Sequence, residues 1–430
     1  MPQAAKPWHV VMACFLGWTI DAFDFFILVF VVSDVAREFG TSITTITWAL
    51  TLTLGLRPVG ALLFGRLADR YGRKPVLMAN ILSFSLLAVA TGFAPNLMVF
   101  LLVRALFGIA MGGEWGIGAS LTMESIPARW RGTVSGILQS GYSFGYLLAA
   151  LLYGIGYSTL GWRGLFLAAV VPALLVLYIR RAVPESPAWE RQRQAGGVAA
   201  RVSLGQSLRR HRRLYLYAIL LMTAAATFSH GTQDLYPVFL REQHHLGARE
   251  ISILAVIFNI GAILGSLCGG SLSQIIGRRR QLALASGLAL LLLPFWASAS
   301  GVVALGATAF LMQFLVQCTF GVMPAHLNEI SPPEARATFP GFTYQFGNML
   351  AAGNATVQAA LAASFGGNYG LGLGIVVAVG AVAFCLLALF GVEAKETDMS
   401  IDPVLPPEPA SAPVLPLGQP TGQPISPRLV

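Results

Sequence analysis

Long apolar segments alternate with short polar connections along most of this 430-residue chain. About 20 apolar residues, each adding about 1.5 Å of helix, suffice to cross the hydrocarbon core of a bilayer. The pattern predicts twelve membrane-spanning helices, at residues 8–36, 44–68, 76–94, 97–122, 133–158, 162–182, 214–240, 250–275, 281–299, 302–327, 338–364 and 368–391. It lacks the apolar–polar alternation of a transmembrane β-barrel. The expected fold class is therefore an all-α membrane protein.

Two motifs recur at one separation, which indicates an internal repeat. GRLADRYGRK begins at Gly65 and GSLSQIIGRR at Gly270, while ESIPARWRGT begins at Glu124 and EISPPEARAT at Glu329, so both pairs are offset by 205 residues. We expect an N-terminal six-helix bundle at 1–182, a basic cytoplasmic linker at 183–213 and a C-terminal six-helix bundle at 214–392. The proline-rich segment at 393–430 lacks periodicity and is expected to be a disordered cytoplasmic tail.

Composition and charge support a membrane protein and suggest its orientation. The chain is 55% hydrophobic and 11% charged, whereas a soluble domain usually carries about 25% charged residues. The net charge of +9 comes from basic residues in alternate connections, so it reports topology rather than nucleic-acid binding. By the positive-inside rule, both termini of this multi-pass protein are expected in the cytoplasm, with the protein in the cell (inner or plasma) membrane. The four cysteines fall within spans without metal-ligand spacing, and are expected to be small core residues.

The segment GRLADRYGRK resembles the loop motif between helices 2 and 3 of the major facilitator superfamily, and the resemblance extends over all twelve expected spans. It implies that superfamily's fold, with two pseudo-symmetric six-helix bundles. Asp69 can pair with Arg70, Arg73 or Arg131 and hold the cytoplasmic ends together. Binding of anionic lipid by a basic loop is the alternative. The expected gating residues, none of which should touch substrate, are Asp69, Arg70, Arg73, Glu124, Arg131, Glu329 and Arg336.

Ionisable residues inside a predicted span are candidates for function because burying them is costly. Arg57 lies eight residues before the loop motif, roughly 12 Å into the bilayer. It is therefore expected to face an internal aqueous cavity, where its planar guanidinium fits a carboxylate. A structural ion pair with Asp21 or Asp24 is the alternative for Arg57. The other such residues are Arg104, Glu114, His230 and Asp234.

The stretch TFSHGTQDLYPVF at 227–239 places polar groups inside an apolar run. His230 and Asp234 are four residues apart, so on a helix they share one face, and Gln233 flanks it. A lone histidine in such a helix is more often a core residue. This cluster would need several matching partners, which favours a role in binding substrate or protons. The repeat offset places His230 at the level of residue 25, beside Asp24.

The same stretch is similar to the helix-7 signature of Jen-type monocarboxylate/proton symporters of the sialate/proton symporter family. Ser229, His230, Thr232, Gln233 and Asp234 match that signature, whereas Ala226 and Val238 stand where Asn and Thr are expected. The resemblance implies substrate binding by a helix-2 arginine, matched by Arg57, and by a helix-11 Gln/Asn pair, matched by Gln345 and Asn348. Packing of polar groups between helices is the alternative for that pair.

Other segments resemble neighbouring acid-transporting families. DAFDFF resembles the span-1 motif of aromatic-acid and sialate symporters, with Ala22 in place of glycine, and GGEWGIGASLTMESIP resembles their span-4 signature. Arg104 resembles a span-4 arginine that is linked to proton transfer in proton-coupled members. Span 5 lacks the glycine–proline motif of drug/proton antiporters, which favours symport.

The expected function is import of a small monocarboxylate such as lactate or pyruvate by proton symport, with symport of a larger acid (an aromatic acid or sialate) as the alternative. An enzyme or a non-transporting sensor is not favoured, because the chain has no catalytic motif and no long cytoplasmic extension. We expect a monomer in the lipid bilayer, with no metal and no cofactor besides the coupling proton. The expected substrate-binding residues are Arg57, His230, Gln233, Tyr344, Gln345 and Asn348, and the expected proton-coupling residues are Asp21, Asp24, Arg104, Glu114 and Asp234.

Overall fold

The computed structural model describes residues 7–41, 43–168, 171–194, 204–395 and 397. Part of the expected linker (195–203) and nearly all of the expected tail (398–430) lie outside the described residues. The described chain is helical and contains no strand, which confirms the all-α prediction.

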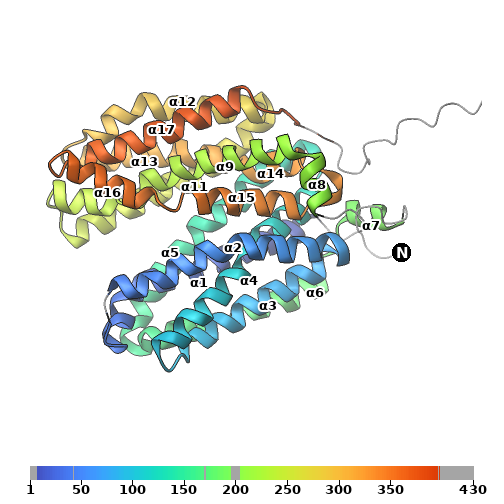
Figure 1. Ribbon diagram of the computed structural model, residues 1–430, viewed down its shortest axis with the longest axis horizontal. Helices are drawn as coiled ribbons and strands as arrows, with labels where there is room; N and C mark the ends of the chain where they lie inside the picture. The colour runs from blue at the N-terminus through green and yellow to red at the C-terminus, as the bar shows by residue number, and fades with distance from the viewer. Residues whose placement is uncertain (1–6, 42, 169–170, 195–203, 396, 398–430) are drawn as a thin grey trace, which may run out of the picture.

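Two helical bundles lie side by side (Figure 1). The first contains α1 (Pro7–Glu38), α2 (Ile43–Tyr71), α3 (Arg73–Gly92), α4 (Leu97–Ser125), η1 (Ala128–Trp130), α5 (Arg131–Leu167) and α6 (Val171–Ala182). The second contains α9 (Arg212–Gln233), α10 (Tyr236–Val238), η4 (Phe239–Gln243), α11 (Ala248–Ile276), α12 (Arg278–Ala297), α13 (Val302–Phe320), α14 (Met323–Glu329), η5 (Pro333–Ala335), α15 (Thr338–Leu350), α16 (Asn354–Ser364) and α17 (Tyr369–Leu389). Short helices α7 (Pro187–Gln194) and α8 (Leu204–Arg210) lie at one end of the molecule.

Nine helices of the described chain are long and apolar enough to cross a bilayer. Several helix breaks lie within or between the expected spans. Gly161, with φ 60° and ψ 179°, kinks α5 between the fifth and sixth expected spans. The seventh span leaves the α-helix after Gln233 and continues as a short helix and a π-helical turn. The eleventh span is two helices, α15 and α16, separated by a turn at residues 351–353.

The repeat seen in the sequence is also present in the structure at the same offset. Helices α2 and α11 begin at 43 and 248 and end at 71 and 276, and α3 and α12 begin at 73 and 278 and end at 92 and 297. The short turns η1 and η5 begin at 128 and 333. Equivalent positions of the two bundles can therefore be compared residue by residue.

Large apolar side chains cover the outside of both bundles. Leu86, Met98, Phe295 and Val303 are each more than 65% exposed, a distribution that suits a surface in contact with lipid. Cys268 is also exposed, so the expectation that all four cysteines are core residues is wrong at this position. Lipid is as apolar as a protein core, and sequence hydropathy does not distinguish the two.

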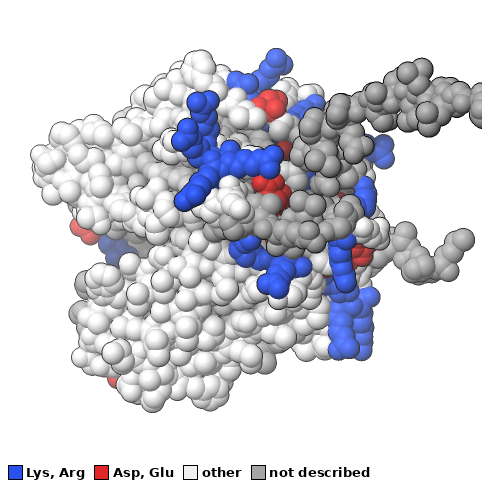
Figure 2. Space-filling view, turned by 45° about the vertical axis from the view of Figure 1, so that its right-hand side comes forward, with Lys and Arg blue, Asp and Glu red and all other residues white. Residues whose placement is uncertain are grey.

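The bundles meet most tightly near the end of the molecule where Lys and Arg side chains gather, which we call the basic end (Figure 2). Helices α5 and α11 touch backbone to backbone there. A Cβ atom at Gly132 would lie 2.5 Å from Gly270 O, and one at Gly270 would lie 2.4 Å from Gly132 O, so neither position has room for a side chain. Ser266 Oγ donates to Gly136 O across the same seam. At the opposite end the surface is hollowed between the two lobes (Figure 2).

Candidate functional site

Arg57 of α2 is held inside the molecule and does not face lipid. The residue is 6% exposed. Its Nη2 donates to Met111 Sδ at 2.6 Å, and the guanidinium carbon lies 5.3 Å from the centroid of the Phe25 ring. Within the described chain, no carboxylate oxygen lies within 4 Å of it, so the alternative of a closed ion pair with Asp21 or Asp24 is not formed in this structure.

Four of the expected proton-coupling residues lie together in the interior of the N-terminal bundle. Asp21 and Asp24 of α1 and Arg104 of α4 are fully buried, and Glu114 of α4 is 1% exposed. Asp21 is in electrostatic range of Arg57, Arg104 and Glu114, and Asp24 is in range of Arg104. We call these four residues and Arg57 the acid–arginine cluster.

The acid–arginine cluster is poorly satisfied by the protein itself. Among the described residues, none of its carboxylate oxygens and no Arg104 nitrogen has a hydrogen-bond partner. The Arg104 guanidinium instead lies 4.1 Å from the centroid of the Phe107 ring. Burying ionisable groups in this way costs several kcal/mol unless water or a proton compensates. Such an arrangement is typical of sites where protons or ions bind.

The C-terminal bundle contributes a histidine–aspartate pair. His230 Nδ1 lies 3.1 Å from Asp234 Oδ1, as the four-residue spacing predicts, and both side chains are about one-third exposed. Gln233 Nε2 donates to Ser229 Oγ at 2.7 Å. Asp234 caps the end of α9, so the polar cluster lies where this span stops being a regular helix. That break explains why an apolar segment carries these groups.

Side chains of α16 stabilise the broken helix. Asn354 Nδ2 donates to Thr227 O at 3.0 Å, and Gln358 Nε2 donates to Gly231 O at 2.6 Å. These amides fix the carbonyl groups of the last turns of α9. The position of His230 and Asp234 is therefore set by a helix that lies more than a hundred residues later in the chain.

Helix α15 brings two expected binding residues to the pair. Asn348 interacts with the His230 side chain, and its Nδ2 donates to Tyr344 O at 3.0 Å. The Tyr344 ring stacks on Trp115 of α4, with centroids 4.0 Å apart. Gln345 is buried, and within the described chain its amide has no hydrogen-bond partner. Among the described residues, Gln345 therefore forms no side-chain hydrogen bond with Arg57 or His230.

Electrostatic interactions connect the two bundles across the middle of the molecule. Arg57 is in electrostatic range of His230 and Tyr344. Tyr142 of α5 is in range of Arg57 and Asp21 on its own side and of Asp234 on the other. The Arg57 guanidinium and the His230–Asp234 pair therefore face the same region between the two bundles, which we call the common region.

Three residues of this region escaped the sequence analysis. Trp115 was noted only as part of the segment that resembles a span-4 signature, and Gln139 and Tyr142 were not singled out. Trp115 Nε1 donates to Gln139 Oε1 at 3.2 Å, and Tyr142 stacks on Trp18 at 5.6 Å. Uncharged side chains in a span carry little signal in a single sequence, because they look like ordinary core residues.

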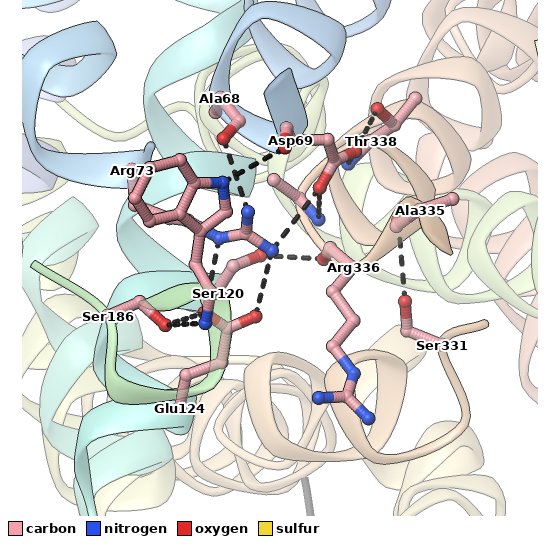
Figure 3. Close-up of polar contacts among 12 residues, drawn as sticks. Ala68, Asp69, Arg73, Ser120, Glu124, Ser186, Ser331, Ala335, Arg336 and Thr338 are labelled. Carbon is pink, nitrogen blue, oxygen red and sulfur yellow. Dashed lines mark hydrogen bonds and ion pairs between the residues drawn. The ribbon is translucent and has the colours of Figure 1, made fainter. Parts of the chain in front are cut away.

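At the basic end, Asp69 connects the two bundles (Figure 3). Its carboxylate accepts hydrogen bonds from Ala337 N at 3.0 Å, Thr338 N at 3.2 Å and Thr338 Oγ1 at 2.6 Å. Arg73 lies 3.3 Å from Asp69 and 3.0 Å from Glu124. These contacts tie α2 to the start of α15, and we call them the first latch.

The second latch is the repeat of the first, and the offset of 205 residues identifies its members. Arg278 pairs with Glu329 at 2.9 Å, as Arg73 does with Glu124. Gln274, at the position equivalent to Asp69, accepts a hydrogen bond from Gly132 N at 2.9 Å and one from Arg278 Nη2 at 3.0 Å. Arg278 was not among the expected gating residues, although its offset from Arg73 would have found it.

The other expected gating residues surround the latches. Arg70 lies over the Tyr71 ring at 5.2 Å, and Arg131 Nε donates to Met123 O at 3.0 Å. The carbonyl of Arg336 accepts a hydrogen bond from Ser120 Oγ at 2.8 Å, which crosses between the bundles (Figure 3). Of the three expected partners of Asp69, Arg73 is the one that forms the ion pair shown in the structure.

The connection after α6 also contributes to the first latch. Glu185 accepts hydrogen bonds from the backbone N–H groups of Arg73 and Lys74 at the start of α3. Burial raises the pKa of Glu185, and these hydrogen bonds only partly offset that effect. Ser186 Oγ hydrogen-bonds to Glu124. The first residues of the expected linker are thus packed against the N-terminal bundle.

Comparisons with known proteins agree on one family. The family description of the Major Facilitator Superfamily matches residues 14–233 and 234–420. A solved structure of the proton:xylose symporter XylE, bound to 6-bromo-6-deoxy-D-glucose, superposes with a TM-score of 0.72 at 19% identity and covers 92% of this chain and 98% of that one. At this identity the likeness concerns the fold alone, and it confirms the predicted arrangement of two bundles.

Two relatives are named as transporters. The carboxylic acid transporter protein homolog of Saccharomyces cerevisiae is 29% identical over 378 residues, which are 83% of this chain and 61% of the yeast protein. The chain thus spans less than two thirds of that relative. The probable 4-methylmuconolactone transporter of Cupriavidus pinatubonensis is 30% identical over 403 residues, 90% of this chain and 91% of the relative. These findings confirm the prediction of a multi-pass membrane transporter rather than an enzyme.

Proposed function

Since the chain belongs to the Major Facilitator Superfamily, we propose that it is a proton-coupled symporter that imports a small monocarboxylate such as lactate or pyruvate. The observation that carries this proposal is the setting of Arg57. Its guanidinium is buried, has no carboxylate within 4 Å among the described residues, and lies in electrostatic range of His230 in the opposite bundle. A permanent cation in such a place is suited to an anionic substrate.

The substrate carboxylate is proposed to bind the guanidinium of Arg57 through two parallel hydrogen bonds. His230, Asn348 and Tyr344 would then contact the hydroxyl or keto oxygen of the acid, with Gln233 and Gln345 completing the polar surround. The yeast relative, which is named as a carboxylic acid transporter homolog, supports an acid as the substrate.

The charge of the acid–arginine cluster supports coupling to protons. Three carboxylates and two guanidinium groups sum to one negative charge when all are ionised. An incoming carboxylate adds a second negative charge to a buried region, which is unfavourable at low dielectric. One proton taken up by Asp21, Asp24 or Asp234 offsets it, so the loaded transporter carries the same charge as the empty one. No cofactor besides the proton is needed.

The direction of transport is proposed from the closed basic end. The positive-inside rule places this end in the cytoplasm. The two latches hold it shut in the structure, so substrate would enter from the opposite end. Rocking of the bundles would then open the latches and release acid and proton inside.

Reconstituted vesicles test the proposal. Purified protein in proteoliposomes should accumulate labelled lactate when the outside is made acidic, and a protonophore should abolish accumulation. Uptake should be electroneutral, so a membrane potential imposed with valinomycin should leave the rate unchanged. A net current during uptake would contradict the stoichiometry of one proton per monocarboxylate.

A larger acid is the second candidate, and one observation favours it. Four aromatic side chains lie around the common region: Trp18, Trp115, Tyr142 and Tyr344. Such surfaces suit a planar or ring-shaped substrate, and the 4-methylmuconolactone transporter supports a substrate of that kind. Lactate uptake measured against a panel of unlabelled acids separates the two. Stronger inhibition by aromatic acids or sialate than by pyruvate would favour the larger substrate.

A further inference from the structure

Glu114 has a setting that the proposed substrate contacts do not explain. The side chain is 1% exposed, and within the described chain neither of its oxygens has a hydrogen-bond partner. It projects toward α1 at Gly17, where a Cβ atom would lie 2.5 Å from Glu114 Oε1. The carboxylate oxygen occupies the space that a Cβ atom at residue 17 would take. The seam between α1 and α4 is thus shaped around an acidic side chain.

Along the length of the N-terminal bundle, Glu114 lies between the two aspartates of α1, Asp21 and Asp24, and the first latch. Helix α1 starts at the basic end, so Gly17 lies about 6 Å nearer to that end than Asp21 does. On α4, Glu114 follows Arg104 by ten residues and precedes Glu124 of the first latch by ten. Asp24, Asp21 and Glu114 therefore form a series that leads toward the basic end through the interior of one bundle.

The surroundings of Glu114 supply no cation at bonding distance. Among the described residues, no Arg or Lys nitrogen lies within 4 Å of it. The titratable groups facing it are Asp21 and Cys14 of α1, both in electrostatic range. Helix α3 contributes the neutral Asn80, whose Nδ2 donates to Ala110 O. Two ionised carboxylates in this apolar seam would repel each other without compensation.

Arg57 offers a link between substrate and proton. Arg57 is in electrostatic range of Asp21, and a nearby positive charge stabilises an ionised carboxylate. A substrate anion bound to Arg57 would cancel much of this influence, so Asp21 would bind a proton more readily when substrate is present. By linkage, a proton on Asp21 would equally strengthen binding of the anion.

Resting on the proposed symport function, we propose that Asp21 and Glu114 share the coupling proton and pass it to the basic end through the interior of the N-terminal bundle, apart from the substrate's own path. The proton arrives from the outer cavity at Asp24 or Asp21 and moves to Glu114 by way of bound water. Glu114 releases it when the basic end opens. Only O–H bonds are broken and formed, and no other reactant is required.

The Glu114→Gln variant tests this relay in proteoliposomes. Accumulation of labelled lactate driven by a pH gradient should fall at least tenfold. Exchange of internal for external lactate at equal pH should stay within about twofold of wild type. A lumenal pH dye should report acidification during lactate uptake by wild type and none by the variant. The control is Thr319→Val, at the repeat position of Glu114, which should accumulate lactate like wild type.

The outcomes for the Glu114→Gln variant distinguish failure of the proton relay from failure of the proposed function. Normal accumulation by Glu114→Gln would overturn the relay and leave symport as proposed. Loss of both accumulation and exchange, in a variant that elutes and melts like wild type, would also overturn it, because Glu114 would then serve substrate binding or structure. If wild type itself transports no acid under a pH gradient, the proposed function falls together with the relay.

Discussion

The two bundles are built on the same plan, yet the acid–arginine cluster belongs to only one of them. With the offset of 205 residues, the positions of the acid–arginine cluster correspond to Ala226, Ser229, Ala262, Ala309 and Thr319 in the C-terminal bundle. The equivalent helices form there with small neutral residues. The fold therefore does not require the charges, and because burial makes them costly, they are best explained by function. The C-terminal bundle has its own titratable pair, His230 and Asp234, at positions that have no charged equivalent.

The same contrast appears where the bundles meet. Asp69 of the first latch accepts hydrogen bonds from Ala337 N and Thr338, and Gln274 of the second accepts one from Gly132 N. The backbone geometry is alike, but one acceptor is a carboxylate and the other an amide. Hydrogen bonds to a charged acceptor are stronger, so the first latch should hold the basic end shut more firmly than the second.

A third instance lies at the end opposite the basic one. Glu38 pairs with Arg163 at 2.7 Å, whereas Gln243 at the equivalent position accepts a neutral hydrogen bond from Gly370 N at 3.0 Å. At all three places the N-terminal bundle thus has a charged side chain where the equivalent position of the C-terminal bundle is neutral. The role of these charges is tested by substitutions that remove a charged side chain from the N-terminal bundle. They are matched by changes at equivalent positions of the C-terminal bundle.

The largest effect is expected from Arg57→Lys. Lysine keeps the charge but loses the planar pair of donors, and losing a hydrogen bond to a charged partner costs about 1.5–3 kcal/mol. Initial rates of lactate uptake should show kcat/KM lowered by roughly 10- to 100-fold. Ala262→Ser, the matched change in the other bundle, should have little effect. Near-normal uptake by Arg57→Lys would return this residue to a structural role.

Asp234→Asn should come next. Asp234 faces the region from which the proton reaches Asp24 or Asp21. The amide can still accept a hydrogen bond from His230 but cannot hold a proton for delivery to the relay, so accumulation under a pH gradient should be lost while lactate exchange persists. Measuring both in the same vesicles separates coupling from binding. If accumulation survives, proton coupling depends on the N-terminal bundle alone, and Asp24→Asn should then abolish it.

A smaller effect is expected at the first latch. Asp69→Asn leaves one side-chain oxygen where two now accept three hydrogen bonds, at a cost of about 1–3 kcal/mol. The fraction of molecules that are closed at the basic end should fall. Distances between spin labels on the α2–α3 and α11–α12 connections would report this change. Gln274→Ala removes a neutral amide that accepts from Gly132 N and donates to Ala128 O, and it should shift the distances less. Equal shifts would refute the proposed difference between the latches.

The smallest effect is expected from Glu38→Gln. Burial opposes ionisation of Glu38, but hydrogen bonds from Arg163 and Trp162 outweigh it and lower the pKa of this carboxyl. A lowered pKa means that the ion pair stabilises the folded protein above the ordinary pKa of glutamate and that this contribution is lost as the pH falls through the lowered value. The partners are partly exposed, so less than about 1 kcal/mol is expected. Thermal unfolding at neutral pH should show a small loss that disappears in acid.

The sequence by itself determined the features that depend on local spacing. Apolar runs set the position of the helices because a bilayer imposes their length. The four-residue spacing of His230 and Asp234 was enough to predict their contact. The offset of 205 residues related the bundles and paired Glu124 with Glu329 before any contact was known, and the same offset leads from Arg73 to Arg278.

Tertiary structure decided which groups meet. Asp69 binds Ala337 and Thr338, more than 260 residues away, and Trp115 stacks on Tyr344 from the other bundle. The breaks in the seventh and eleventh spans, and the carboxylate of Glu114 placed against Gly17 with no hydrogen-bond partner among the described residues, also appear only in the packed molecule. Hydropathy and periodicity describe one helix at a time, whereas these contacts depend on how helices are arranged in three dimensions.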